Sequence, residues 1–129
     1  MFDQFTWTHI PALFVATATT FGGLLPFFSA KRAIEGFGLP KRFAVSKEAQ
    51  PIMVFCSARI TTIGAIMFAF YFQDKFAEVD TVMLVLGAYV GGVDGYVCWR
   101  EGARKKGVER ALSGAAIAAW GWFGMTAGA

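Results

Sequence analysis

Four long apolar stretches alternate with polar segments along the chain. The apolar stretches cover residues 10–30, 51–72, 81–99 and 111–129. Each holds about 20 residues, the length at which an α-helix crosses the hydrocarbon core of a bilayer. The pattern predicts an all-α membrane protein in which residues 1–129 form one domain, a bundle of four transmembrane helices.

The connections predict how these helices are arranged. Only the short segment 73–80 joins the second and third stretches, so we expect these two helices to be antiparallel neighbours. Pro11 suits the first turn of the first helix, and Pro26 is expected to kink or end that helix. Asp80 is a candidate N-cap for the third helix.

Regularly spaced glycines predict where helices touch. Gly87, Gly91 and Gly95 recur every four residues, so they form one bare stripe along the third helix. Such a stripe lets a neighbouring helix approach backbone to backbone. Gly124 and Gly128 in the last stretch have the same spacing. We therefore expect all five glycines at helix-packing contacts.

Two charged residues lie inside apolar stretches, Arg59 in the second and Asp94 in the third. On insertion scales, each unpaired charge at the centre of a membrane helix costs on the order of 3 kcal/mol. Antiparallel helices bring the two to similar depth, so we expect an Arg59–Asp94 ion pair. Two interpretations stay open: a structural lock between helices, or part of a polar pocket open to one side of the membrane.

The amino-acid composition favours a membrane protein over a soluble domain. The chain is 56% hydrophobic and only 16% charged, a balance typical of small membrane proteins and rare in soluble domains. Cys56 and Cys98 fall in apolar stretches, where we expect buried, inert thiols. The only histidine, His9, is expected at a membrane interface. One histidine and two distant cysteines make no metal set, and no cofactor motif occurs, so we expect no metal and no cofactor.

The cations are concentrated in two segments. Residues 31–50 and 100–110 carry five Lys or Arg each, whereas the segment 73–80 carries one. By the positive-inside rule, both charged segments are expected on the cytoplasmic side and both termini on the other side. In a eukaryotic cell, the endoplasmic reticulum is the expected membrane. Topology and anionic lipids account for these cations, and nucleic acid is not an expected partner.

Several short motifs resemble a known family. They are Phe37-Gly38-Leu39-Pro40, Ala58-Arg59 ahead of Gly64, Gly92-x-Asp94, and Trp99-Arg100-Glu101-Gly102. From Ala33 onward, the chain resembles a family of short four-helix integral membrane proteins of unknown function. Its members occur in bacteria and fungi, and some are encoded in fungal natural-product gene clusters.

The resemblance implies a fold and a membrane location, with secondary metabolism as an expected setting, and it supplies no reaction. In that family a histidine often stands at the head of the last helix. This chain reads Val108-Glu109-Arg110-Ala111 there, so a role for that histidine does not carry over unless Glu109 replaces it.

Three classes of function follow, and whether the protein is an enzyme stays open. The first is binding or conversion of a hydrophobic metabolite, by proton transfer as in isomerisation or cyclisation. Asp94 would be its acid or base, Arg59 the electrostatic partner, and Tyr96, Trp99 and Trp122 the walls. The second is an accessory subunit or scaffold whose glycine faces dock a membrane partner or a second copy. A small transporter is the weakest, because one buried pair provides no ion path.

Overall fold

The structure, a computed structural model, describes residues 5–128, and these form helices joined by short turns, with no strand among them. The prediction of an all-α protein is therefore confirmed over this range. In chain order the elements are the 3₁₀ turn η1 (Trp7–His9), α1 (Ile10–Gly22), α2 (Leu25–Phe37), α3 (Lys41–Ala44), α4 (Ala49–Phe72), α5 (Phe76–Val85), the π-helical segment η2 (Leu86–Val90), α6 (Gly91–Arg100) and α7 (Arg104–Trp122).

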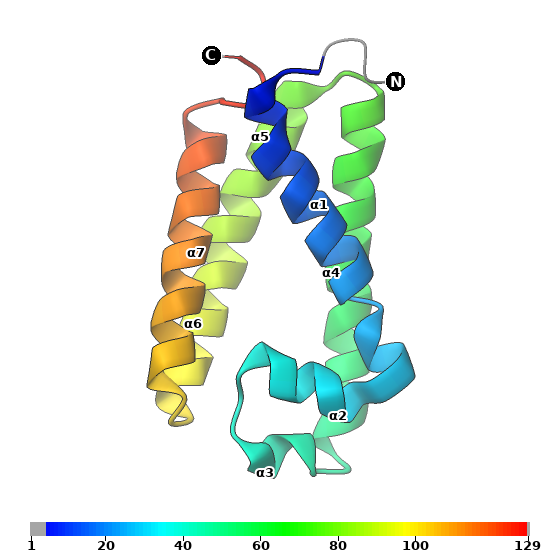
Figure 1. Cartoon of the computed structure of the whole chain (residues 1–129), viewed down its shortest axis with the longest axis vertical. Coiled ribbons are helices and arrows are strands. Elements are labelled where there is room, and N and C mark those ends of the chain that lie inside the picture. Colours follow the sequence, from blue (N-terminus) through cyan, green and yellow to red (C-terminus); the bar gives the residue numbers. More distant parts are fainter. Residues whose placement is uncertain (1–4, 129) are drawn as a thin grey trace.

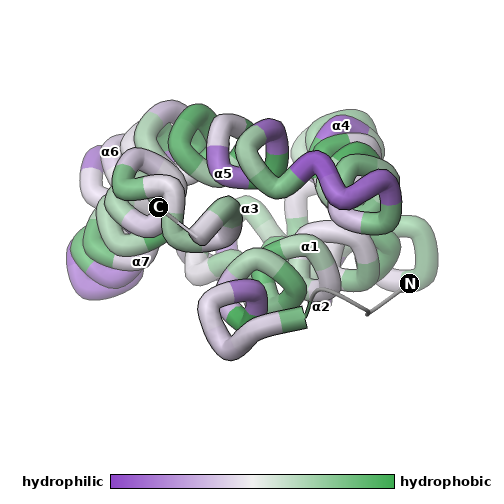
Figure 2. Tube along the Cα trace, turned by 90° about the horizontal axis from the view of Figure 1, so that it is seen from above, coloured by the Kyte–Doolittle hydropathy of each residue, from purple (hydrophilic) through white to green (hydrophobic). Residues whose placement is uncertain are grey.

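The long helices form two layers. The elements α5, η2 and α6 continue into one another as a single rod, Phe76–Arg100, whose α5 part packs on α4 and whose α6 part diverges from α4. In the second layer α1 crosses α4 and α7 runs along the rod (Figures 1 and 2). The start of η1 and the end of α7 lie at one end of the molecule, and α2 and α3 lie at the other, which we call the charged end.

The rod and α7 touch through glycines. A Cβ added to Gly91 would lie 2.6 Å from the Cα of Gly114, and one added to Gly95 would lie 2.8 Å from the carbonyl oxygen of Gly107. Gly87 meets the backbone of the same α7 segment. Non-bonded carbon atoms sit about 3.5–4.0 Å apart, so no side chain fits at these positions. The stripe of three glycines is thus the face on which α7 packs.

The glycines of α7 have a spacing of their own. Gly107, Gly114 and Gly121 recur every seven residues, and all three are buried. A seven-residue repeat keeps one side of a helix facing its partner in a left-handed pair. This repeat, which the sequence already contains, marks the packing face of α7.

The predicted packing role of Gly124 and Gly128 is wrong. The helix α7 ends at Trp122, so both glycines lie beyond it in turns. Their φ angles are 63° and 86°, in the left-handed region that glycine enters without steric cost. Both glycines therefore belong to the turns after the helix and not to its packing face.

The first apolar stretch is not one straight helix. The helix α1 ends at Gly22, and α2 starts at Leu25 at an angle of 101° to it. Pro26 lies in the first turn of α2, where its missing amide hydrogen removes no intrahelical bond. The expected break therefore occurs, but it turns the chain sideways before residue 30.

The described residues contain two helices long and apolar enough to cross a membrane, α4 and the rod. Counting the bent pair α1–α2 as one span gives three. The helix α7 is not among them, because it begins seven residues earlier than predicted, and its first two turns carry charges. These charges belong to Arg104, Lys105, Lys106, Glu109 and Arg110. The structure thus contains two to three candidate spans. It does not confirm a bundle of four spans or the orientation of that bundle.

Large apolar side chains cover much of the surface. Phe14, Phe28, Tyr89 and Trp122 are each more than 70% exposed. Figure 2 shows hydrophobic stretches along the helices and a hydrophilic connection between α4 and α5. Large exposed apolar patches on a folded chain indicate a partner surface or lipid. Together with the candidate spans, they are compatible with an integral membrane protein.

The glycine contact generates a prediction with a matched control. Replacing Gly91 with Ala should lower the melting temperature in detergent, because overpacking costs about 1–3 kcal/mol. Replacing Gly92 with Ala should leave it equal or higher, since nothing lies within 4 Å of a Cβ there and Ala favours a helix by about 1 kcal/mol over Gly. If both variants melt alike, α7 does not touch Gly91.

Candidate functional site

Asp94 lies on the inward side of the rod. Met83 and Cys98 share this side by helical spacing, and both are completely buried. The side chain of Asp94 nevertheless keeps 26% of its exposure. Within the described part of the chain, no donor hydrogen-bonds its carboxylate. Asp94 is therefore an inward-facing acid with most of its acceptor capacity unused.

Arg110 of α7 is the ion-pair partner of Asp94. Its Nη1 lies 3.8 Å from Oδ2 of Asp94. Its Nε and Nη2 donate to the backbone carbonyl oxygen of Phe37 at 3.2 and 2.9 Å, and its guanidinium lies 3.7 Å from the centre of the Phe37 ring. Phe37 ends α2, and Gly38 closes that end with φ 107°. A cation is favoured there, because the last carbonyls of a helix carry partial negative charge.

A second tie joins the same two parts of the chain. Nη2 of Arg42 in α3 lies 2.8 Å from a carboxylate oxygen of Glu101 and 3.0 Å from its backbone carbonyl oxygen. Glu101 follows α6 in the turn to α7. Arg42 and Arg110 together fasten the α2–α3 segment to the α6–α7 hairpin. Three of the motifs noted in the sequence therefore meet at the charged end.

The predicted Arg59–Asp94 pair is wrong. The guanidinium of Arg59 is exposed, and its Nη1 donates to the carbonyl oxygen of Phe55 at 2.9 Å, one turn back in α4. Ser57, two residues away, is buried at the contact with the α1–α2 turn. Two residues rotate a helix by about 200°, so Arg59 points outward. Equal depth did not make the residues partners, because α6 packs on α7 and not on α4.

The signal for the true partner was present in the glycine spacing. Gly91 meets Gly114 and Gly95 meets Gly107, so residue numbers across the two antiparallel helices sum to about 202–205. Residue 94 then lies opposite a position near residue 110. Matching the glycines of the third and fourth stretches would have indicated Arg110 from the sequence.

The predicted aromatic walls do not surround Asp94. Tyr96, Trp99 and Trp122 are 62%, 49% and 71% exposed. Trp99 packs under the guanidinium of Arg104 at 5.2 Å, and Trp122 ends α7, far along the helix from Arg110. All three side chains are largely exposed, so they do not enclose Asp94.

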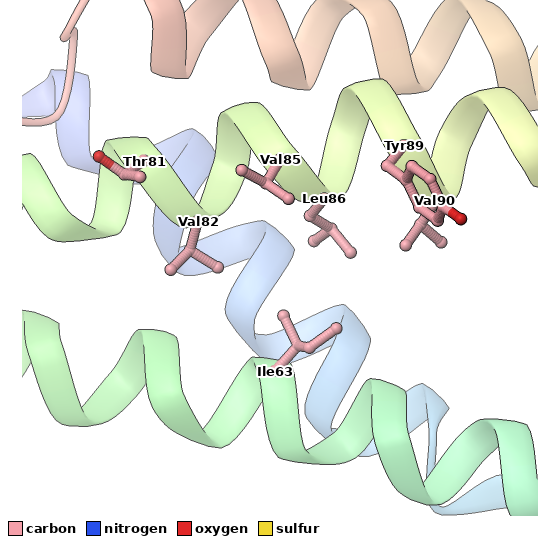
Figure 3. Close-up of a pocket in the computed structure, with 7 residues that line it drawn as sticks. All are labelled: Ile63, Thr81, Val82, Val85, Leu86, Tyr89 and Val90. Atoms are coloured by element: carbon pink, nitrogen blue, oxygen red, sulfur yellow. The ribbon is translucent and has the colours of Figure 1, made fainter.

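An apolar pocket of about 300 Å³ lies between α4 and the rod (Figure 3). Its lining residues are Ile63, Thr81, Val82, Val85, Leu86, Tyr89 and Val90. Val82, Leu86 and Val90 recur every four residues, and Asp94 takes the next place in that series. The π-helical segment η2 supplies part of this wall, and such segments are frequent at functional sites. Asp94 lies one turn beyond Val90 on the rod and is not among the residues that line the pocket.

Two buried polar contacts at the opposite end were not expected. Asp80 lies inside α5, so it is not the predicted N-cap, and its carboxylate accepts the amides of Thr126 and Ala127 at 3.1 and 2.8 Å. His9 is 3% exposed, with its Nδ1 3.0 Å from the hydroxyl of Tyr71. Both contacts fasten the segments that begin and end the described chain to the long helices.

The remaining candidates for chemistry are few. Cys98 is buried as expected, but Cys56 is exposed on α4, which corrects the prediction for that thiol. Within residues 5–128 no group of three or more His, Cys, Asp or Glu side chains is placed to hold a metal ion. Asp94 and Arg110 are therefore the residues on which chemistry at the charged end would depend.

The ion pair predicts a specific pattern of coupling. In a double-mutant cycle, Asp94→Asn and Arg110→Gln should show a coupling free energy of about 0.5–1 kcal/mol, because the pair is long and partly exposed. The cycle of Asp94→Asn with Arg59→Gln should show none. Thermal unfolding in detergent measures both. Coupling to Arg59 and not to Arg110 would contradict the pairing.

Comparison with known families gives one match. Residues 16–124 match the family described as Domain of unknown function (DUF4267). Comparisons with curated proteins and with solved structures gave no match.

Proposed function

Because the chain belongs to the DUF4267 family of domains of unknown function, we propose a function from its own residues. The protein is a small multi-pass membrane protein that binds a hydrophobic metabolite. The polar group of that metabolite meets the Asp94–Arg110 pair, and its apolar body lies in the pocket beside the rod.

The unused acceptor capacity of Asp94 carries this proposal. An acid inside an apolar helix is costly, and ionisable residues at such positions usually mark binding or proton-transfer sites. Arg110 approaches the carboxylate of Asp94 no closer than 3.8 Å, because two of the nitrogens of Arg110 bond to Phe37. A carboxylate held this loosely retains lone pairs for a hydroxyl, an amine or an acidic proton of a ligand.

Proton transfer is the chemistry that such a site supports. Asp94 would take a proton from one position of the bound metabolite and return it at another, which is an isomerisation without net loss of atoms. Arg110 would hold the carboxylate in place and stabilise negative charge on the ligand. The apolar lining would exclude water from the reacting group.

The distribution of cations supports an orientation of the protein in the membrane. The charged end, with α2, α3 and the start of α7, lies on the cytoplasmic side, since it collects the ten cations of the two basic segments. The start of η1 and the end of α7 share the other end (Figure 1). A second copy or a membrane partner would pack on the exposed apolar faces.

The orientation is open to a direct check. Tags placed at the two termini should both be accessible from the non-cytoplasmic side in sealed vesicles, and protected on the cytoplasmic side. Protease digestion followed by immunoblotting reads out each tag. Termini on opposite sides would mean an odd number of spans and would contradict the proposed topology.

The functional role of Asp94 is tested by complementation. In cells lacking the gene, the wild-type chain should restore the profile of apolar metabolites, and Asp94→Asn should lose at least about a hundredfold in product formation, as expected for removal of a general acid or base. Glu35→Gln, an exposed carboxylate outside the site, is the control. Mass spectrometry of solvent extracts measures the result.

The outcomes separate the two leading classes of function. Full complementation by a stably expressed Asp94→Asn variant would contradict the proposal and favour an accessory or scaffold role. Loss of complementation with unchanged protein level and melting temperature would support the site.

A further inference from the structure

Arg59 is a cation on the outer surface of an apolar helix. It is the only charged residue in α4, and its neighbours on the outward side, Ile52, Phe55 and Ile66, are exposed and apolar. Its Nη1 donates to the carbonyl oxygen of Phe55. Among the described residues it has no ion-pair partner. A guanidinium has five N–H donors, so most of its hydrogen-bonding capacity points away from the protein.

The counter-charge for Arg59 does not come from a second copy of this chain packed on the same face of α4. A symmetric contact through the outward side of α4 would bring two Arg59 side chains together, and α4 carries no acid to separate them. Unpaired like charges in a membrane interface are strongly unfavourable. The inward acids are also engaged, since Asp94 pairs with Arg110 and Asp80 accepts two backbone amides.

We propose that Arg59 binds the phosphate group of an anionic phospholipid on the outer face of α4, in the leaflet at the charged end. A guanidinium offers two parallel N–H donors that match two phosphate oxygens. The inference rests on the membrane placement proposed above and not on the role of Asp94.

The depth of Arg59 fits such a lipid. It lies ten residues after Ala49, the start of α4, or about 15 Å along the axis. The contact with Phe55 shows that its side chain runs back by one turn, about 5 Å, toward that start. The guanidinium thus lies about 10 Å along the axis from the start of α4, and a long arginine side chain can reach the headgroup layer from such a depth. Lys47, exposed just before α4, adds attraction for anionic headgroups.

Native mass spectrometry of the full chain tests the site. Protein extracted from vesicles of phosphatidylcholine and phosphatidylglycerol should retain phosphatidylglycerol. Arg59→Gln should retain about tenfold less, as expected for loss of a charge-assisted contact. Arg59→Lys should retain an intermediate amount, because it keeps the charge without the two-pronged geometry. Lys47→Gln is the control for general attraction to the charged end and should change retention by less than about twofold.

Four results would overturn the inference. These are equal retention by Arg59→Gln, equal loss in Lys47→Gln, displacement of the lipid by millimolar inorganic phosphate, and a cross-linked dimer that requires Arg59. Arg59→Lys keeps the test valid if Arg59→Gln fails to fold. Alkaline carbonate extraction separates the two proposals. A chain released by carbonate contradicts the membrane placement itself, whereas a retained chain with unchanged lipid binding contradicts the lipid site alone.

Discussion

The backbone contact between the rod and α7 is the interaction on which the rest of this structure depends. Gly91 and Gly95 meet Gly114 and Gly107 with no side chain between them, so the two helices have one register. In that register Arg110 stands beside Asp94. A shift by one residue would turn the guanidinium to another side of α7 by about 100°. The candidate site is therefore a consequence of helix packing.

Arg110 extends this contact to the α2–α3 segment at the charged end. By bonding to the carbonyl oxygen of Phe37, it fixes the end of α2, and Arg42 repeats the connection through Glu101. The broken first stretch makes this possible, because α2 turns by 101° away from α1 to lie at the charged end. One cation thus both balances the inward acid and holds the segment that borders it.

Helix positions could be predicted because apolar runs of membrane length constrain secondary structure strongly. The glycine spacing likewise located the face on which α7 packs. The partner of Asp94 could not be found from depth alone, since depth says nothing about direction around a helix, and Arg59 faces outward. The fourth span is not confirmed, because α7 was expected to begin after the charges of residues 104–110, whereas those charges belong to its first turns.

Cross-linking of engineered cysteines in the membrane tests the central claim, that the glycine register places Arg110 beside Asp94. Cys56 and Cys98 are first replaced by alanine, and a short bifunctional thiol reagent is added to vesicles that contain the paired variants. Asp94→Cys with Arg110→Cys should be joined within one chain by the reagent, because the native side chains meet at their tips, 3.8 Å apart. Asp94→Cys with Arg59→Cys should not be joined. Cross-linking of the second pair and not the first would contradict the account.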